Sequence, residues 1–198
     1  MKRRNLAILL LITSFLFLGC TKSKEGYAKI SFEPLSEREE EILSLTENRV
    51  FLYKIKNIPK GKYKITLNYE RYKGGEEVKK EPILTLLKEE GEKEISLGIN
   101  FKGKNKINCI LGEEGSYSNT SYETEENIEE YASGSFSGKE ELNLEPSKRL
   151  ILYYGTLDSI GFSNKPIGDY MDSEYILDEF IKGAKEGVFL TLSLDKKE

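Results

Sequence analysis

Apolar and polar residues alternate at every second position through much of the chain beyond residue 26. Between Tyr63 and Glu70 every odd-numbered residue is a tyrosine, an isoleucine or a leucine, and every even-numbered residue is polar. Successive side chains of a β-strand point to opposite faces of its sheet, so this period of two is typical of strands with one buried face. The pattern therefore predicts a mainly β fold.

Turn-forming residues between the alternating runs divide the chain into about eight short strands. The run 49–58 and the run that starts at Tyr63 flank a Pro-Lys-Gly turn at 59–61, which predicts a hairpin. A second hairpin is expected across 102–105, because Gly103 can adopt a positive φ there.

The C-terminal part of the chain completes the expected fold. Residues 149–157 form the most continuous apolar run after residue 26, which is typical of a strand buried on both faces. Apolar residues recur at helical spacing over about 172–186, and a final strand is expected at 188–194. These elements predict a two-sheet β-sandwich of about eight strands, with one C-terminal α-helix before the last strand. No repeat or linker divides 27–198, so we expect a single domain.

The first twenty residues have the order of parts found in a secretory signal. Three basic residues at positions 2–4 precede an apolar stretch at 6–18. This stretch is too short for a stable membrane span, which needs about 20 residues, and is typical of the core of a signal peptide. It ends at Phe17-Leu18-Gly19-Cys20, which resembles the lipobox of bacterial lipoproteins, with Phe17 where the family usually has an aliphatic residue.

The resemblance to bacterial lipoproteins implies cleavage before Cys20 and acylation of its sulfur. Residues 1–19 would then be the signal peptide, and 20–26 would be the lipidated cysteine and a short polar tether. Acyl chains on Cys20 would hold the protein in the cell membrane, on its extracytoplasmic face, with membrane lipid as a partner. Cys109 would have no partner in the chain and is expected to be a buried thiol.

A second, shorter pattern lies between the first two expected strands. Ser36 and Glu39 have the spacing of a capping box, which predicts about one and a half helical turns over 36–43. The run LSEREEEILSLT, followed by RVFLYKIKN, is similar to the start of small uncharacterised surface lipoproteins of Gram-positive bacteria. That resemblance implies no particular activity.

The composition excludes several kinds of chemistry. The chain has no histidine and no tryptophan, so it offers no imidazole base for a catalytic triad and no histidine ligand for zinc. Residues 1–19 hold three of the 30 basic residues and no acidic residue, which leaves a formal net charge of −7 on the rest. An acidic surface repels phosphate backbones, so we expect no nucleic-acid partner.

Residues 112–139 are rich in Glu, Ser, Gly and Tyr and almost free of aliphatic side chains. They are expected to form either a long loop or a set of exposed edge strands. Tyr and Ser make adaptable contacts at low entropic cost, so this segment is a candidate recognition loop. The candidate contact residues are Tyr117, Tyr122, Tyr131, Glu123, Glu125 and Glu126.

Clustered carboxylates in the same segment raise the question of a Ca²⁺ site. The spacing D-x-D-x-D-G is missing, and a run of solvated charges is the simpler interpretation. We therefore expect no metal site, no cofactor and no catalytic residue.

The sequence favours a lipid-anchored, extracytoplasmic lipoprotein that acts as a non-catalytic binding or structural module of the cell envelope. Its partner is expected to be another envelope protein or a glycan. One alternative is an enzyme that uses paired carboxylates on wall polysaccharide, because that mechanism needs no histidine. Another alternative is an assembly subunit, which an unpaired edge strand would support.

Overall fold

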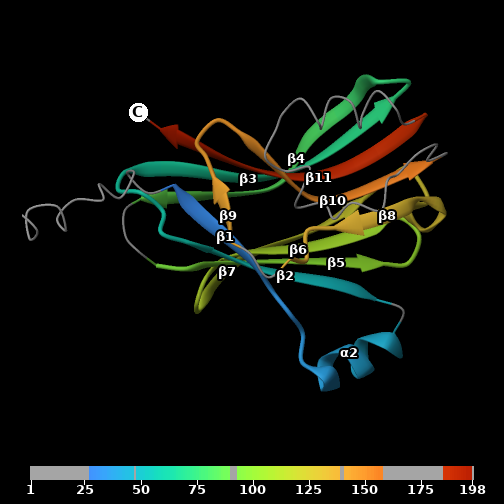
Figure 1. Cartoon of the computed structure of the whole chain (residues 1–198), viewed down its shortest axis with the longest axis horizontal. Coiled ribbons are helices and arrows are strands. Elements are labelled where there is room, and N and C mark those ends of the chain that lie inside the picture. Colours follow the sequence, from blue (N-terminus) through green and yellow to red (C-terminus); the bar gives the residue numbers. More distant parts are fainter. Residues whose placement is uncertain (1–26, 47, 90–92, 139–140, 158–184, 198) are drawn as a thin grey trace, which may run out of the picture.

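The computed structural model describes residues 27–46, 48–89, 93–138, 141–157 and 185–197. Within these residues the protein is mainly β, with eleven strands in two antiparallel sheets and one α-helix (Figure 1). The helix expected at about 172–186 lies outside the described residues except for its last two positions, and Glu186 begins a strand. The segments 1–19 and 20–26 also lie outside them.

The first sheet has six strands in the order β7–β6–β5–β2–β1–β9. Its strands are β1 Ala28–Glu33, β2 Arg49–Lys56, β5 Ile95–Lys102, β6 Lys106–Glu113, β7 Ser116–Glu123 and β9 Leu142–Leu144. The second sheet has five strands in the order β4–β3–β11–β10–β8. Its strands are β3 Lys62–Lys73, β4 Glu76–Glu89, β8 Ala132–Ser135, β10 Arg149–Leu157 and β11 Glu186–Lys197.

Both sheets contribute to one hydrophobic core. Leu67 of β3 and Leu192 of β11 are paired in the five-stranded sheet and belong to the same buried cluster as Ile55 of β2. The hydroxyl of Tyr53 in β2 donates a hydrogen bond of 3.3 Å to the backbone oxygen of Leu152 in β10. Figure 1 shows β4 and β11 in its upper part and β2 and β5 in its lower part.

The prediction of a hairpin between the run 49–58 and the run from Tyr63 is wrong, because β2 and β3 belong to different sheets. β2 pairs with β1 and β5, whereas β3 pairs with β4 and β11. The chain crosses between the sheets through Asn57 and Gly61, whose φ values of 55° and 135° lie in the left-handed region. A strand with one buried face has the same alternation whichever strand it pairs with, so the pattern could not distinguish these arrangements.

Two local predictions are confirmed. β5 and β6 form the second hairpin, and Gly103 has a φ of 60° in its turn. The helix α2 spans Glu37–Ser44, and Ser36 and Glu39 form its capping box. Figure 1 shows α2 projecting away from both sheets, and none of its residues is buried.

The count of about eight strands was too low because two of the strands are polar and a third is very short. β7 and β8 both lie within 112–139, and each is the last strand of its sheet. Of the two expectations for this segment, exposed edge strands are right for Ser116–Glu123 and Ala132–Ser135, which are separated by a loop with the short 3-10 helix Ile128–Glu130. β9 has only three residues.

The apolar run 149–157 forms β10, which has buried side chains on both faces. Leu152 is buried in the main core. On the other face Ile151 and Tyr154 are partly buried against a smaller cluster made of Tyr72 and Phe189. Thr156, on the same face as Tyr154, is 1% exposed, so the expectation of burial on both faces is met in large part.

Candidate functional site

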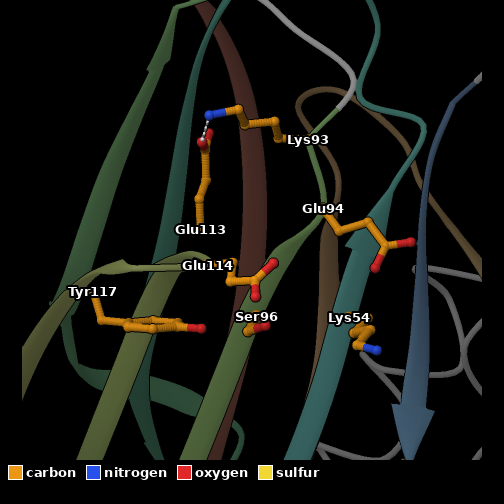
Figure 2. Close-up of a pocket in the computed structure, with 7 residues that line it drawn as sticks. All are labelled: Lys54, Lys93, Glu94, Ser96, Glu113, Glu114 and Tyr117. Carbon is orange, nitrogen blue, oxygen red and sulfur yellow. Dashed lines mark ion pairs between the residues drawn. The ribbon is translucent and has the colours of Figure 1, made fainter.

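A surface cavity of about 700 Å³ lies on the six-stranded sheet, where β5 begins and β6 ends (Figure 2). Its lining residues come from four neighbouring strands and the chain next to them: Lys54, Lys93, Glu94, Ser96, Glu113, Glu114 and Tyr117. The cavity thus combines two lysines, three glutamates and two hydroxyl groups.

Strand alternation directs two of these side chains away from the core. Lys54 lies between the buried residues Tyr53 and Ile55 of β2, and Ser96 lies between two buried residues of β5. Neighbours along a strand point to opposite faces, so both polar side chains lie on the face that points away from the core. The cavity is therefore formed on the outer face of the six-stranded sheet.

A glycine keeps the space between the strands open. Gly112 of β6 is paired with Ser96 on one side and with Tyr117 on the other. A Cβ atom on Gly112 would lie 2.2 Å from the backbone oxygen of Ser116, so any side chain there would displace the β6–β7 hairpin. Figure 2 shows the Tyr117 hydroxyl pointing across this space toward Ser96.

Charges of both signs line the cavity, and most of them are paired. The ammonium nitrogen of Lys93 lies 3.5 Å from a carboxylate oxygen of Glu113, and Glu113 also forms an ion pair with Lys88. The hydrogen bond from Lys88 holds the pKa of Glu113 below its ordinary value. The hydrogen bond to Glu33, at 3.1 Å, raises the pKa of Lys54. Both Glu113 and Lys54 are therefore charged at neutral pH.

Two further carboxylates lie at the cavity. Glu94 is 3.5 Å from Lys56, and Figure 2 shows it next to Lys54. Glu114 is exposed in the turn between β6 and β7, and Figure 2 shows its side chain close to Ser96. A ligand in the cavity would therefore meet cations and carboxylates together.

The pKa values of four described carboxyl groups bear on the enzyme alternative. A glycoside hydrolase needs one carboxyl group whose pKa is raised so that it can donate a proton. Among the described residues, every carboxyl group with a displaced pKa has a lowered one: Glu39, Glu70, Glu81 and Glu113. These four groups stay ionised at neutral pH.

Thiol chemistry needs an accessible thiolate, and metal binding needs several ligating side chains together. Cys109 of β6 is 1% exposed, and burial raises the pKa of its thiol to about 12. The expected buried thiol is thereby confirmed. Within the ranges that the structure describes, no group of three or more acidic or cysteine side chains is arranged to hold a metal ion.

The three candidate tyrosines lie in different environments. Tyr117 is 48% exposed and lines the cavity. Tyr131 is 7% exposed and belongs to the core. Tyr122 is partly buried, donates a hydrogen bond to Glu81, and has the ammonium of Lys79 5.7 Å from its ring centre.

The three candidate glutamates are divided in the same way. The side chain of Glu126 is 7% exposed, accepts a hydrogen bond of 2.6 Å from Tyr69, and lies 2.6 Å from Arg71. Glu126 is therefore held by β3. Glu123, at the end of β7, and Glu125 are exposed.

Sequence reasoning missed most of the cavity. Lys54, Lys93, Glu94 and Ser96 were not candidates, because each is an ordinary polar residue on or beside a strand and lies far from Tyr117 in the sequence. Only the pairing of β2 with β5, β5 with β6 and β6 with β7 brings them together. The spacing of these residues along the chain does not indicate which strands pair or in what register.

A second polar cluster lies on the five-stranded sheet, on the face that points away from the main core. Glu70 of β3 is only 1% exposed, although the alternation places it among the polar residues. It accepts hydrogen bonds from Arg149 at 2.7 Å, Tyr72 at 2.9 Å and Thr191 at 2.7 Å, and Lys80 lies 3.1 Å away. Both carboxylate oxygens are thus used within the protein, which indicates a structural role.

Comparison with known protein families, curated proteins and solved structures finds no match to this chain. None of the helices in the described ranges has the length and apolar character needed to cross a membrane.

Proposed function

We propose that this protein is a lipid-anchored, extracytoplasmic lipoprotein that acts as a non-catalytic binding module of the cell envelope. In this proposal residues 27–198 form one domain, and its two sheets pack as a β-sandwich. The single observation that carries the binding function is the cavity beside Tyr117 on the outer face of the six-stranded sheet.

The chemistry of the cavity indicates a polar ligand. The half-exposed ring of Tyr117 offers an apolar face together with a hydroxyl group, which suits a sugar or a peptide side chain. Lysines and glutamates around it can bind groups of either charge. Wall glycans and envelope peptides both carry such groups, and they are the ligand classes to test first.

The position of Cys20 supports the anchor. Its place directly after the apolar stretch is the basis of the lipobox resemblance, and β1 begins eight residues later, at Ala28. Seven connecting residues would span at most about 25 Å when fully extended. An acylated Cys20 would thus keep the domain close to the membrane surface.

We expect wall glycan fragments or envelope peptides to raise the Tm of the protein, and Tyr117→Ala to abolish that shift. A ligand at a hundred times its Kd stabilises the folded state by about 2.7 kcal/mol, which is a shift of several degrees. The measurement is a thermal melt with and without each ligand. Tyr27→Ala is the matched control, since Tyr27 is 39% exposed and does not line the cavity.

Tyr117→Phe separates the roles of the ring and the hydroxyl, because it keeps the ring and removes the group that points toward Ser96. A ligand shift that survives Tyr117→Ala unchanged would place the binding site elsewhere and remove the support for this function.

We expect Cys20→Ser to abolish the incorporation of a labelled fatty acid and to leave the signal peptide uncleaved. Serine lacks the sulfur that is acylated in the lipoprotein family that this terminus resembles. The measurement is metabolic labelling followed by mass determination of the chain. Cys109→Ser is the matched control and should be labelled and cleaved like the natural protein. Equal labelling of Cys20→Ser would exclude the anchor.

One observation also supports the assembly-subunit alternative. β7 is the last strand of the six-stranded sheet, and the described part of the chain supplies no further strand beside it. The enzyme alternative has no comparable support, because every described carboxyl group with a displaced pKa has a lowered one.

A further inference from the structure

Three of the four sheet edges are protected against pairing with another chain. β9 has three residues and β8 has four, so neither offers a long template. β4 is longer, but its register with β3 shifts twice, and it contains Pro82, Lys79 and Lys80. Short strands, bulges, proline and lysine are the devices by which natural sheets prevent edge pairing.

The fourth edge, β7, has none of these devices. It spans eight residues, contains no proline and no basic residue, and keeps an unbroken register with β6 from Glu123 opposite Lys106 to Ser116 opposite Glu113. Six of its eight residues are exposed. β7 therefore presents a regular, accessible strand.

The hairpin geometry shows which amides of β7 are free. Glu113 and Ser116 flank a two-residue loop, so they form a hydrogen-bonded pair, and every second residue after Ser116 also bonds to β6. The N–H of Thr124, which continues this even-numbered series, donates to the oxygen of Asn105 at 2.8 Å. The odd-numbered residues therefore direct their N–H and C=O groups away from β6, where no described strand lies.

The segment that contains this edge strand carries charge of one sign. Residues 112–138 contain seven glutamates and no lysine, arginine or aspartate. Exposed carboxylates lie beyond both ends of the strand, with Glu114 in the loop before it and Glu125 after it, and Glu123 is the last residue of the strand itself. Glu125 is also 3.8 Å from Arg71 and 3.9 Å from Lys79, and Glu123 is opposite Lys106 in the register with β6. Glu114 is therefore the carboxylate of this set with no basic partner in the described part of the chain. Opposite charges on facing residues of neighbouring strands stabilise pairing, and like charges oppose it. A second copy of β7 would add further carboxylates here, whereas a basic strand would be attracted.

We propose that β7 accepts an extended, lysine- or arginine-bearing polypeptide segment as a seventh strand of the sheet. This inference rests on the proposed binding function and names the partner class for that surface. Main-chain hydrogen bonds would supply affinity, and pockets beside the added strand would supply specificity. Tyr117 lies on the edge strand and also lines the cavity, so an added strand would lie beside the cavity.

The test uses the full-length chain in detergent micelles and an eight-residue peptide of alternating lysine and threonine. Hydrogen exchange at single amides is measured with and without the peptide. We expect slower exchange at the odd-numbered amides Tyr117, Asn119 and Ser121, and no change at Ser118 and Thr120, which already bond to β6. A peptide of alternating glutamate and threonine is expected to bind about tenfold more weakly or worse.

Two variants at one position separate the edge amide from the side chain. Ser121→Pro removes an outward N–H and leaves the bonds to β6 in place, so the lysine peptide should bind about tenfold more weakly. Ser121→Ala keeps the N–H and should bind like the natural protein. If Ser121→Pro lowers the melting temperature, the exchange pattern of the unsubstituted chain still decides the question.

Several results would overturn strand addition. Peptide binding without slower exchange at the odd-numbered amides would exclude it, as would no binding or equal binding of both peptides. If the chain alone sediments as a dimer, and Ser121→Pro abolishes that dimer, then the edge strand binds a second copy of the chain instead. If a ligand raises the Tm in a way that depends on Tyr117, while the peptide leaves the exchange of the β7 amides unchanged, the proposed binding function stands. That result would exclude only the added strand as its partner.

Discussion

Replacing Glu70 with alanine is expected to lower the free energy of unfolding by roughly 3 kcal/mol, because removing one member of a buried charge cluster leaves the others without compensation. The carboxylate is 1% exposed and accepts a hydrogen bond from Arg149 at 2.7 Å. Thr191, which is fully buried, would also lose its acceptor. In a domain of this size the Tm should fall by roughly 6–12 °C.

Urea denaturation of the natural and substituted proteins measures this effect. Glu123→Ala is the matched control, since Glu123 is exposed at the end of β7 and its loss should change stability by less than about 0.5 kcal/mol. If Glu70→Ala lowers the free energy of unfolding by less than about 1 kcal/mol, water must already solvate the charges of this cluster, contrary to the burial of Glu70.

The same cluster predicts a dependence of stability on pH. Burial alone would raise the pKa of Glu70, but the hydrogen bond from Thr191 and the charges of Arg149 and Lys80 outweigh it and lower the pKa below 4.5. The folded state therefore binds this proton less readily than the unfolded state. The stabilisation is complete above the ordinary carboxyl pKa and is lost as the pH falls through the lowered value.

Comparison with Glu70→Gln isolates this contribution, because glutamine keeps the shape and cannot ionise. We expect the natural protein to be the more stable at neutral pH and its advantage to shrink when denaturation is repeated below pH 4.5. An advantage that stays constant into acid would show that the ionised carboxylate is not the stabilising species.

Replacing Tyr53 with alanine is the second large effect, with an expected loss of roughly 3–5 kcal/mol. The side chain is 1% exposed in β2 of the six-stranded sheet. Its ring stacks on that of Phe136 at 6.2 Å, and its hydroxyl donates to the backbone oxygen of Leu152 in the five-stranded sheet. The substitution would remove contacts that join the two sheets.

A series at this position separates packing from hydrogen bonding. Tyr53→Phe should cost about 1 kcal/mol, the usual net value of one hydrogen bond. Tyr27→Ala, at a 39% exposed position, should change stability by less than about 0.5 kcal/mol. Hydrogen exchange of Tyr53→Ala should show weaker protection in both sheets. Weaker protection in the six-stranded sheet alone would contradict the proposed packing of the two sheets as a β-sandwich.

Local features of the fold could be predicted well. Alternation located the long strands, Gly103 marked the turn between β5 and β6, and Ser36 with Glu39 marked the start of α2. Each of these depends on residues within a few positions of one another, and a single sequence contains that information directly.

The candidate site could be predicted only in part. Tyr117 was correctly placed on an exposed segment, whereas Tyr131 and Glu126, from the same polar stretch, are held inside the protein. Composition describes a whole segment, but burial depends on which face of the edge strand or turn each residue occupies. The cavity around Tyr117 needs three strand pairings in register, and none of them is local.

The amino-acid pattern alone settled that the chain forms strands and which side chains along a strand share a face, because both follow from the two-residue repeat of the extended backbone. Tertiary structure alone decided the partner of each strand, and so separated β2 from β3 and brought Lys54 to the same cavity as Tyr117. It also buried Glu70 on a face that the pattern marks as polar. Several strands have nearly equivalent patterns, so only the packing of the whole chain determines which strands pair with one another.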